Sequence, residues 1–168
     1  MASRNPNYQQ IHFNFIHKTY LTPKKAYRMR LAASPNCTLC SLNATGTFIH
    51  MMWECPTVKT FWEQIVKYLS KVLQKQIPCC PKLLLLNDDI SLNLNIVQRR
   101  FWLAGSTAAK KMLALRWQAP HSLPFNHWKQ LLCDVVIMEL STARLNGANC
   151  QTIDSWNHIL YQVRTSNI

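Results

Sequence analysis

Four residues near the N-terminus have the types and the spacing of a zinc site. Two residues separate Cys37 from Cys40, nine residues separate Cys40 from His50, and four residues separate His50 from Cys55. Three thiolates and one imidazole form a closed tetrahedral set in structural zinc sites, which leaves no coordination position for a reacting water. The spacing therefore predicts one structural Zn²⁺ held by Cys37, Cys40, His50 and Cys55, without metal catalysis.

The surroundings of these four residues favour a metal over a metal-free cluster of buried side chains. The segment around them has too few apolar residues to hold itself together. The sequence shows no secretory signal, so we expect a reducing compartment, in which cysteines serve as thiols or metal ligands. The remaining cysteines are poor candidates for a second site: Cys79 and Cys80 are adjacent, Cys133 is expected inside a helix as a buried thiol, and Cys150 is expected in a loop.

The elements that must position this segment are expected to be helical. Thr22 and Pro23 are typical of an N-cap and a first helical position, and Ser34-Pro35 should end that helix. Apolar residues recur at helical spacing from Thr57 to about Gln76. Further helices are expected over residues 92–117, 125–145 and 152–164, with Gly147 as a stop signal. Ile11–Tyr20 is ambiguous, and Leu83–Leu86 is expected to form a short strand or an extended piece.

These elements predict a mainly α fold with several long amphipathic helices and a zinc-stapled knuckle near the N-terminus. We expect a basic lead-in with a short helix over residues 1–35, the zinc knuckle over 36–56 and a helical bundle over 57–168. No apolar run approaches the roughly 20 residues that span a bilayer. The sequence therefore predicts an intracellular protein that does not use a membrane.

The charge of the chain favours a polyanionic partner. Nineteen Lys and Arg face seven Asp and Glu, which gives a formal net charge of +12. Such a balance is typical of proteins that bind nucleic acid, although a basic protein without such a partner is the alternative. In the helix expected over residues 92–117, Arg99 and Lys110 are eleven residues apart, close to three helical turns, and Arg100 and Lys111 repeat the relation. We therefore expect two basic ridges on one side of that helix. The alternative is that these residues form a solvated helix face without a partner.

Single-stranded or structured RNA is the expected target, with DNA as the alternative, because no segment resembles a helix that reads the major groove. Trp53 could stack on an unpaired base or fill the small core of the knuckle, whereas Phe48 is expected in that core against Phe61 and Trp62. The basic residues expected to contact phosphates, or to lie beside the knuckle, are Lys24, Lys25, Arg28, Arg30, Lys59, Arg99, Arg100, Lys110 and Lys111.

No residues suggest an enzyme. Asp88-Asp89 superficially resembles the paired aspartates of polymerases, but no aromatic residue lies two positions before the pair, and no palm domain is present. We interpret both as solvated loop acids. His121 and His127 flank a proline-rich turn without a nucleophile or carboxylate partner, so a surface or capping role is expected.

Two runs around the ligands resemble a known family. They are His17–Pro23, followed by Met29 and Leu31, and Gly46–Pro56, followed by Phe61-Trp62. Together they look like the zinc-binding C-terminal region of LINE-type, non-LTR retrotransposon reverse transcriptases. Weaker likenesses follow at Ile77-Pro78, Pro81, Leu83–Leu86, Ala108–Lys111, Trp117, Pro120, Trp128 and Met138-Glu139. The resemblance covers roughly residues 11–145, is most specific over 17–62, and does not extend to 146–168.

The resemblance implies a non-catalytic tail that binds RNA or DNA and supports target-primed reverse transcription. In the family, polymerase and endonuclease chemistry resides in upstream domains, so the parent protein would be an RNA-directed DNA polymerase. The upstream reverse transcriptase domain would be a partner, and the locations would be a cytoplasmic ribonucleoprotein and the nucleus. One alternative is a structural module that docks on the polymerase body. Another is a host-adopted, stand-alone regulator that binds nucleic acid.

Overall fold

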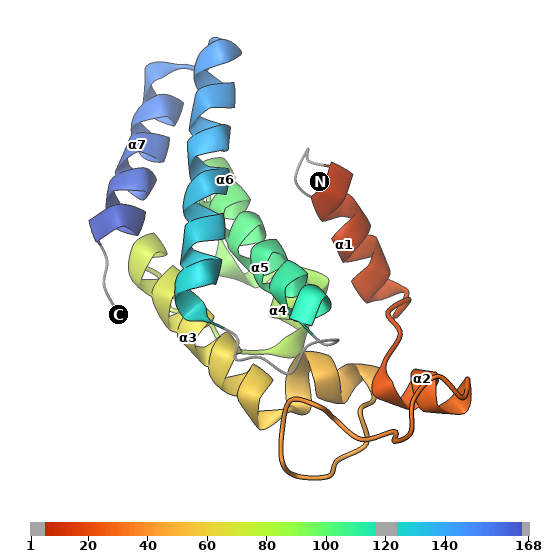
Figure 1. The fold of residues 1–168 in the computed structure, drawn as a ribbon. Coiled ribbons are helices and arrows are strands. Elements are labelled where there is room, and N and C mark those ends of the chain that lie inside the picture. The colour runs from red at the N-terminus through yellow and green to blue at the C-terminus, as the bar shows by residue number, and fades with distance from the viewer. Residues whose placement is uncertain (1–5, 117–123, 166–168) are drawn as a thin grey trace.

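The computed structural model describes two stretches of the chain, residues 6–116 and 124–165. They are mainly helical, as the sequence predicts (Figure 1). In chain order the helices are α1 (Pro6–Ile16), α2 (Pro23–Arg28), a π-helical turn (His50–Glu54), α3 (Pro56–Leu73), α4 (Pro81–Leu86), a 3-10 turn (Ile90–Leu92), α5 (Ile96–Arg116), α6 (Phe125–Leu145) and α7 (Cys150–Thr165). In these stretches, β-type pairing is limited to one bridge between Asn36 and Thr45.

Helix α5 is the centre of the packing. It contacts α1, α3, α4, α6 and α7, and every residue from Phe101 to Lys110 is buried. Helices α6 and α7 pack against each other as an antiparallel pair (Figure 1). The core is unusually rich in indole rings, with Trp62, Trp102, Trp128 and Trp156 all fully buried. A helix apolar on all sides belongs in an interior, and α5 has that position.

Local sequence signals account for several helix boundaries. Thr22 caps α2, because its hydroxyl accepts a hydrogen bond from the backbone N–H of Lys25 at 3.1 Å. Helix α6 spans the predicted residues, and Gly147 adopts a left-handed φ of 64° just beyond it. Helix α2 is shorter than expected. It ends at Arg28, and Arg30 at φ 59° is in a conformation that a right-handed helix cannot contain.

Two expectations for the connecting segments need correction or completion. Leu83–Leu86 lies in helix α4 and not in a strand or extended piece. Pro81 occupies the first turn of this helix and Asn87 ends it at φ 58°, a combination that favours a short helix. The ambiguous segment from Ile11 is helical as far as Ile16, in α1. None of the helices described is both long and apolar enough to cross a membrane.

Candidate metal centre

The four predicted ligands converge on one point. One ligand atom from each of Cys37, Cys40, His50 and Cys55 lies within 4.8 Å of all the others. The sulfurs of Cys37 and Cys55 are 3.9 Å apart, and the sulfur of Cys40 is 3.5 Å from Nε2 of His50. A tetrahedral Zn²⁺ has S···S edges of about 3.8 Å and S···N edges of about 3.6 Å, given its usual bond lengths. The two measured pairs therefore match the edges of a tetrahedral site.

The loop that carries Cys37 and Cys40 is held by backbone hydrogen bonds. The N–H of Cys37 donates to the carbonyl of Ala44 at 2.8 Å, beside the Asn36–Thr45 bridge. The N–H of Leu39 donates to the sulfur of Cys37 at 3.3 Å. Such a bond stabilises negative charge on the sulfur, as expected for a metal-bound thiolate. The turn therefore positions Cys37 and also donates a hydrogen bond to its sulfur, as the surroundings of metal ligands commonly do.

A π-helical turn positions the other two ligands. The N–H of Cys55 donates to the carbonyl of His50 at 2.9 Å, which places these two residues one wide turn apart. The N–H of His50 is in turn satisfied by the hydroxyl of Thr47 at 3.1 Å. Short π-helical turns are rare and often occur at functional sites. Here the extra residue in the turn lets both His50 and Cys55 face the two cysteines of the loop.

Helix α3 anchors the knuckle to the helical bundle. The indole N–H of Trp62 donates to the carbonyl of Met52 at 2.9 Å, inside the core. The hydroxyl of Thr57, in the first turn of α3, donates to the carbonyl of Leu39 at 3.0 Å. Because both halves of the ligand set are bonded to the same helix, the centre and α3 should behave as one unit.

The donor set fits a soft, tetrahedral cation. Burial raises the pKa of the Cys37 thiol to about 12, so this thiol is neutral unless a cation offsets the cost of burying its charge. Thiolate and imidazole ligands select zinc and other thiophilic ions over Mg²⁺ or Ca²⁺. Cys37, Cys40, His50 and Cys55 would therefore hold one metal ion and close its coordination shell. Its contribution would be structural.

The knuckle also makes close contact with basic helix α2. A Cβ atom on Gly46 would lie 2.7 Å from Cβ and Cγ of Pro23, closer than real atoms approach. The carbonyl of Gly46 accepts a hydrogen bond from the N–H of Lys24 at 3.2 Å. Glycine is therefore required where the start of α2 rests on the knuckle.

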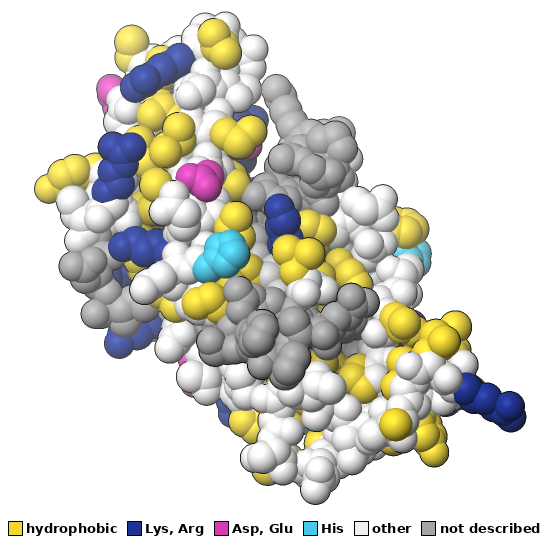
Figure 2. Space-filling model, viewed as in Figure 1, with side chains coloured by type: hydrophobic (Ala, Val, Ile, Leu, Met, Phe, Trp, Pro, Cys, Tyr) yellow, Lys and Arg dark blue, Asp and Glu magenta, His cyan; other side chains and the backbone are white. Residues whose placement is uncertain are grey.

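The basic residues predicted near the knuckle are on the surface. Lys24, Lys25, Arg28, Arg30 and Lys59 are all exposed. The amine of Lys25 donates to the carbonyls of Lys18 and Tyr20, which ties it to the chain entering α2. Basic side chains are visible at the tip of α2 and along the α6–α7 side in the view of Figure 2. No acidic residue precedes Glu54 in the sequence, so the positive charge of α2 is locally unbalanced.

The two basic ridges predicted on α5 are not found. Lys110 is 0% exposed and cannot meet a phosphate, and Lys111 is half-buried. Arg99 is bound to Asp89 although its side chain is 48% exposed, and Arg100 is exposed as well. The eleven-residue spacing was interpreted as a surface feature, but α5 lies in the middle of the bundle. The uncharged, mainly apolar run from Phe101 to Ala109 is the sequence signal that the middle of this helix is buried.

A buried polar cluster surrounds Lys110. Its amine donates to the side-chain oxygen of Asn87 at 2.8 Å and lies 3.4 Å from Nδ1 of His12. Ser106 donates to the same Asn87 oxygen at 3.1 Å. Burial lowers the pKa of Lys110 to about 7, and burial together with the nearby Lys110 charge lowers the pKa of His12. Sequence reasoning missed this cluster, because its members come from α1, α5 and the end of α4 and share no local pattern.

Asp89 also differs from its expected role. It is 6% exposed and is not a solvated loop acid. Its two oxygens accept hydrogen bonds from Nε and an Nη of Arg99 at 2.6 and 3.1 Å. This bidentate contact raises the pKa of Arg99. Its neighbour Asp88 is exposed, as predicted.

The aromatic residues of the knuckle are packed to different degrees. Trp53 is half-buried, and its ring centre lies 6.3 Å from that of Trp62. Phe48 is also half-buried, but it packs edge-on against Phe15 of α1 at 5.8 Å. Trp53 therefore presents part of its ring to solvent and part to the core. Its proposed stacking role stays a prediction.

The other predicted positions are distributed away from the metal centre. Cys133 is half-buried, and Cys150 is exposed as the first residue of α7 and not in a loop. Cys79 is exposed and Cys80 half-buried. His127 is exposed at the start of α6. Trp117, Pro120 and His121 lie outside the described residues.

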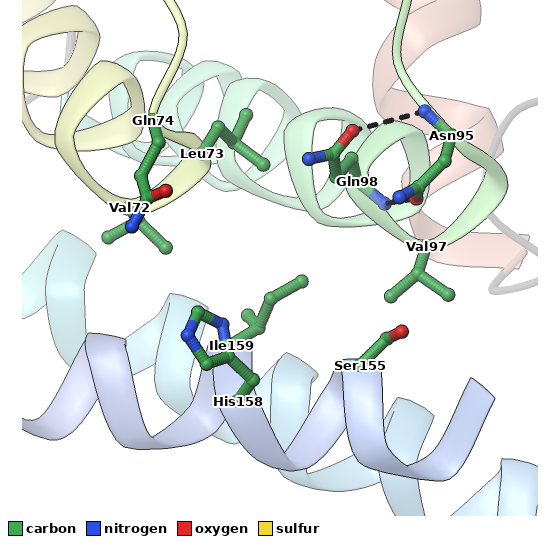
Figure 3. Close-up of a pocket in the computed structure, with 9 residues that line it drawn as sticks. All are labelled: Val72, Leu73, Gln74, Asn95, Val97, Gln98, Ser155, His158 and Ile159. Atoms are coloured by element: carbon green, nitrogen blue, oxygen red, sulfur yellow. Dashed lines mark hydrogen bonds between the residues drawn. The ribbon is translucent and has the colours of Figure 1, made fainter. Parts of the chain in front are cut away.

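A separate hollow of about 250 Å³ lies where the end of α3, the start of α5 and α7 meet (Figure 3). Asn95 and Gln98 face each other at its rim, each side chain bonding the other's backbone N–H at 2.8 and 3.1 Å. This reciprocal arrangement is a capping box that begins α5. His158 and Ser155 line the opposite wall from α7. Since both amides serve as caps, we interpret the polar lining chiefly as part of the helix start.

A search against models of known protein families finds no match to this chain. The family resemblance of the sequence therefore remains an expectation.

Proposed function

We propose that this chain is the zinc-stapled, nucleic-acid-binding tail of a LINE-type retrotransposon reverse transcriptase. One observation carries the proposal: a closed Cys3His centre rests directly on an exposed, acid-free basic helix through Gly46 and Pro23. In this proposal the ion is Zn²⁺ and its role is structural. It fixes the loop against which α2 packs, so that Lys24, Arg28 and Arg30 present a defined set of charges.

RNA is the proposed ligand because these contacts suit a phosphate backbone. Lys and Arg bind phosphates without reading sequence, and their contribution depends strongly on salt. In this proposal Trp53, half-buried beside the metal centre, adds one stacked base through the exposed part of its ring. The proposed role is to hold template RNA for target-primed reverse transcription by an upstream polymerase domain, with no chemistry of its own.

Binding of the zinc-loaded chain to fluorescent single-stranded RNA, measured by anisotropy at about 50 and about 200 mM salt, tests the proposal. The K24E/R28E/R30E variant should lose at least about tenfold in affinity. The slope of log affinity against log salt should fall by about 2, since each lost contact with single-stranded RNA removes roughly 0.7.

The matched control is K67E/R144E/R164E, which changes the charge equally. These three residues are exposed on α3, α6 and α7, remote in sequence from the knuckle. Its affinity should fall clearly less. Equal losses in both variants would show that net charge alone attracts RNA, and the proposed site at α2 would be wrong.

A second candidate function, docking on a partner protein, is favoured by a specific feature. Several large aliphatic side chains are exposed where α1, the knuckle and α4 meet.

A further inference from the structure

An apolar groove lies beside the metal centre. Its volume is about 470 Å³, and it is formed by three segments that are distant in the sequence. The apolar walls are Phe15 and Ile16 of α1, Phe48 and Ile49 of the knuckle, and Leu85 and Leu86 of α4. Ile16, Ile49 and Leu86 remain 48%, 43% and 55% exposed. Large aliphatic residues gathered in this way mark an interaction surface more often than scattered ones.

The rim of the groove is positively charged. Lys18 and Lys82 are exposed and line it, and its described lining contains no Asp or Glu. Within the described stretches, neither amine forms an ion pair. An occupant that places carboxylates beside apolar side chains would therefore complement both the walls and the rim.

The apolar surface is elongated. Phe13 and Ile16 share one face of α1, and His17 follows directly after the helix. The ring centres of Phe13 and His17 are 4.2 Å apart, with the ring planes tilted by 40°. Phe13 is 52% exposed, so apolar surface continues along α1 beyond the groove. A single small molecule would leave this extension uncovered.

We propose that this groove is a docking site for an amphipathic helix of a partner protein, with acidic residues flanking its aliphatic anchors. The helix lays its apolar face between α1 and α4, and its carboxylates pair with Lys18 and Lys82. Helix-in-groove recognition of this kind uses anchors at i, i+3, i+4 and i+7. The groove adjoins α2, since Lys25 donates to the carbonyl of Lys18, but its lining includes none of the proposed phosphate contacts Lys24, Arg28 and Arg30. The inference therefore goes beyond nucleic-acid binding.

Two designed peptides provide the probe. Both share one Leu/Ala framework of about 15 residues, a length at which isolated helices begin to form. One carries Glu beside the leucines and the other carries Lys at the same positions. Methyl NMR shifts of Ile16, Ile49 and Leu86 are followed in the zinc-loaded chain. The Glu peptide should give saturable shifts at these methyls, with affinity at least about tenfold higher than the Lys peptide.

Variants separate the groove from nonspecific charge. The K18E/K82E variant should invert the preference and bind the Lys peptide more tightly. Leu86→Asp should abolish binding, whereas Leu145→Asp, at an 88% exposed position on α6, should leave it unchanged. RNA binding of Leu86→Asp should also be unchanged, so failure of this proposal and failure of RNA binding are distinguishable.

Several results would overturn the proposal. They are absence of shifts with either peptide, or an unchanged preference for the Glu peptide in K18E/K82E. Saturable shifts with dodecanoate but not with the Glu peptide would assign the groove to a lipid-type anion instead. Concentration-dependent dimerisation that Leu86→Asp abolishes would assign it to a second copy of this chain.

Discussion

The side-chain amine of Lys110 lies 2.8 Å from the side-chain oxygen of Asn87, in the interior where α1 and the end of α4 pack on α5. Within the described stretches it has no carboxylate partner. The ring of Phe15 lies 5.8 Å from the amine, and His12 lies beside it. A buried cation with neutral neighbours is costly, which explains why the pKa of Lys110 is lowered to about 7.

This lysine should make stability depend on pH. The amine of the unfolded chain titrates near 10.5, and that of the folded chain near 7. Between these values the unfolded state binds more protons, so the free energy of unfolding contributed by Lys110 rises with pH. Below about pH 7 both states are charged and the full cost of burial is present. Lys110→Met should therefore be more stable than the parent near pH 6.5, and its advantage should shrink by about 2–4 kcal/mol near pH 9.5.

Urea unfolding of the two zinc-loaded proteins measures this change. Taking the difference between them removes the titration of the shared groups that Lys110 does not influence; His12, whose pKa its charge lowers, is the exception. Lys111→Met, a change at the half-buried neighbour, is the control and should show no such trend. A pH-independent difference between Lys110→Met and the parent would contradict the prediction.

The bidentate contact of Arg99 with Asp89 should stabilise the turn before α5. Arg99→Ala leaves a 6% exposed carboxylate without its partner, and the expected loss is about 1–3 kcal/mol in the free energy of unfolding. Arg100→Ala, at the exposed adjacent position, should change stability by less than about 0.5 kcal/mol. Chemical denaturation measures both variants. Equal effects would show that the ion pair contributes nothing beyond ordinary helix surface.

The metal centre should hold one zinc ion for each chain. Cys40→Ser should reduce bound zinc, measured by elemental analysis, from about one to near zero. It should lower stability by at least about 2 kcal/mol, or roughly 4–8 °C in Tm, because the loop then loses its link to His50 and Cys55. Cys150→Ser, at an exposed position outside the cluster, should retain both zinc and stability. Zinc well below one per parent chain, with Cys40→Ser equally stable, would refute the site.

The contact between Gly46 and Pro23 should couple α2 to the knuckle. Gly46→Ala places a methyl group 2.7 Å from two Pro23 carbons and should cost about 1–3 kcal/mol through overpacking. RNA affinity, measured by anisotropy, should fall with it, because α2 is displaced. Gly147→Ala is the control: its φ of 64° makes it strained, yet no neighbour lies within 4 Å. It should lose about 1 kcal/mol while its RNA affinity stays unchanged. A Gly46→Ala protein with unaltered RNA binding would show that α2 and the knuckle are not coupled.

Local sequence determined the ligand set and most helices. Cys37, Cys40, His50 and Cys55 were identified by spacing alone, because short loops restrict how far their side chains can separate. The sequence predicted both ends of helix α6 and, from the Thr22 cap, the start of α2. These features depend on contacts within a few residues, which a single sequence records directly. The prediction of a strand or extended piece over Leu83–Leu86 was wrong. A short apolar run is too short to show the periodicity that distinguishes a helix from a strand.

Tertiary packing alone decided which charges are available. The eleven-residue spacing of Arg99 and Lys110 predicts one surface ridge on α5. Arg99 is exposed near the start of the helix, whereas Lys110 is buried where other helices pack on α5. Burial depends on contacts between segments far apart in the chain, such as Lys110 with Asn87 and His12. The apolar groove between α1, the knuckle and α4 is also formed by contacts between segments far apart in the chain. The sequence thus determined the four candidate metal ligands, whereas the fold determined which residues surround them and which cations reach the surface.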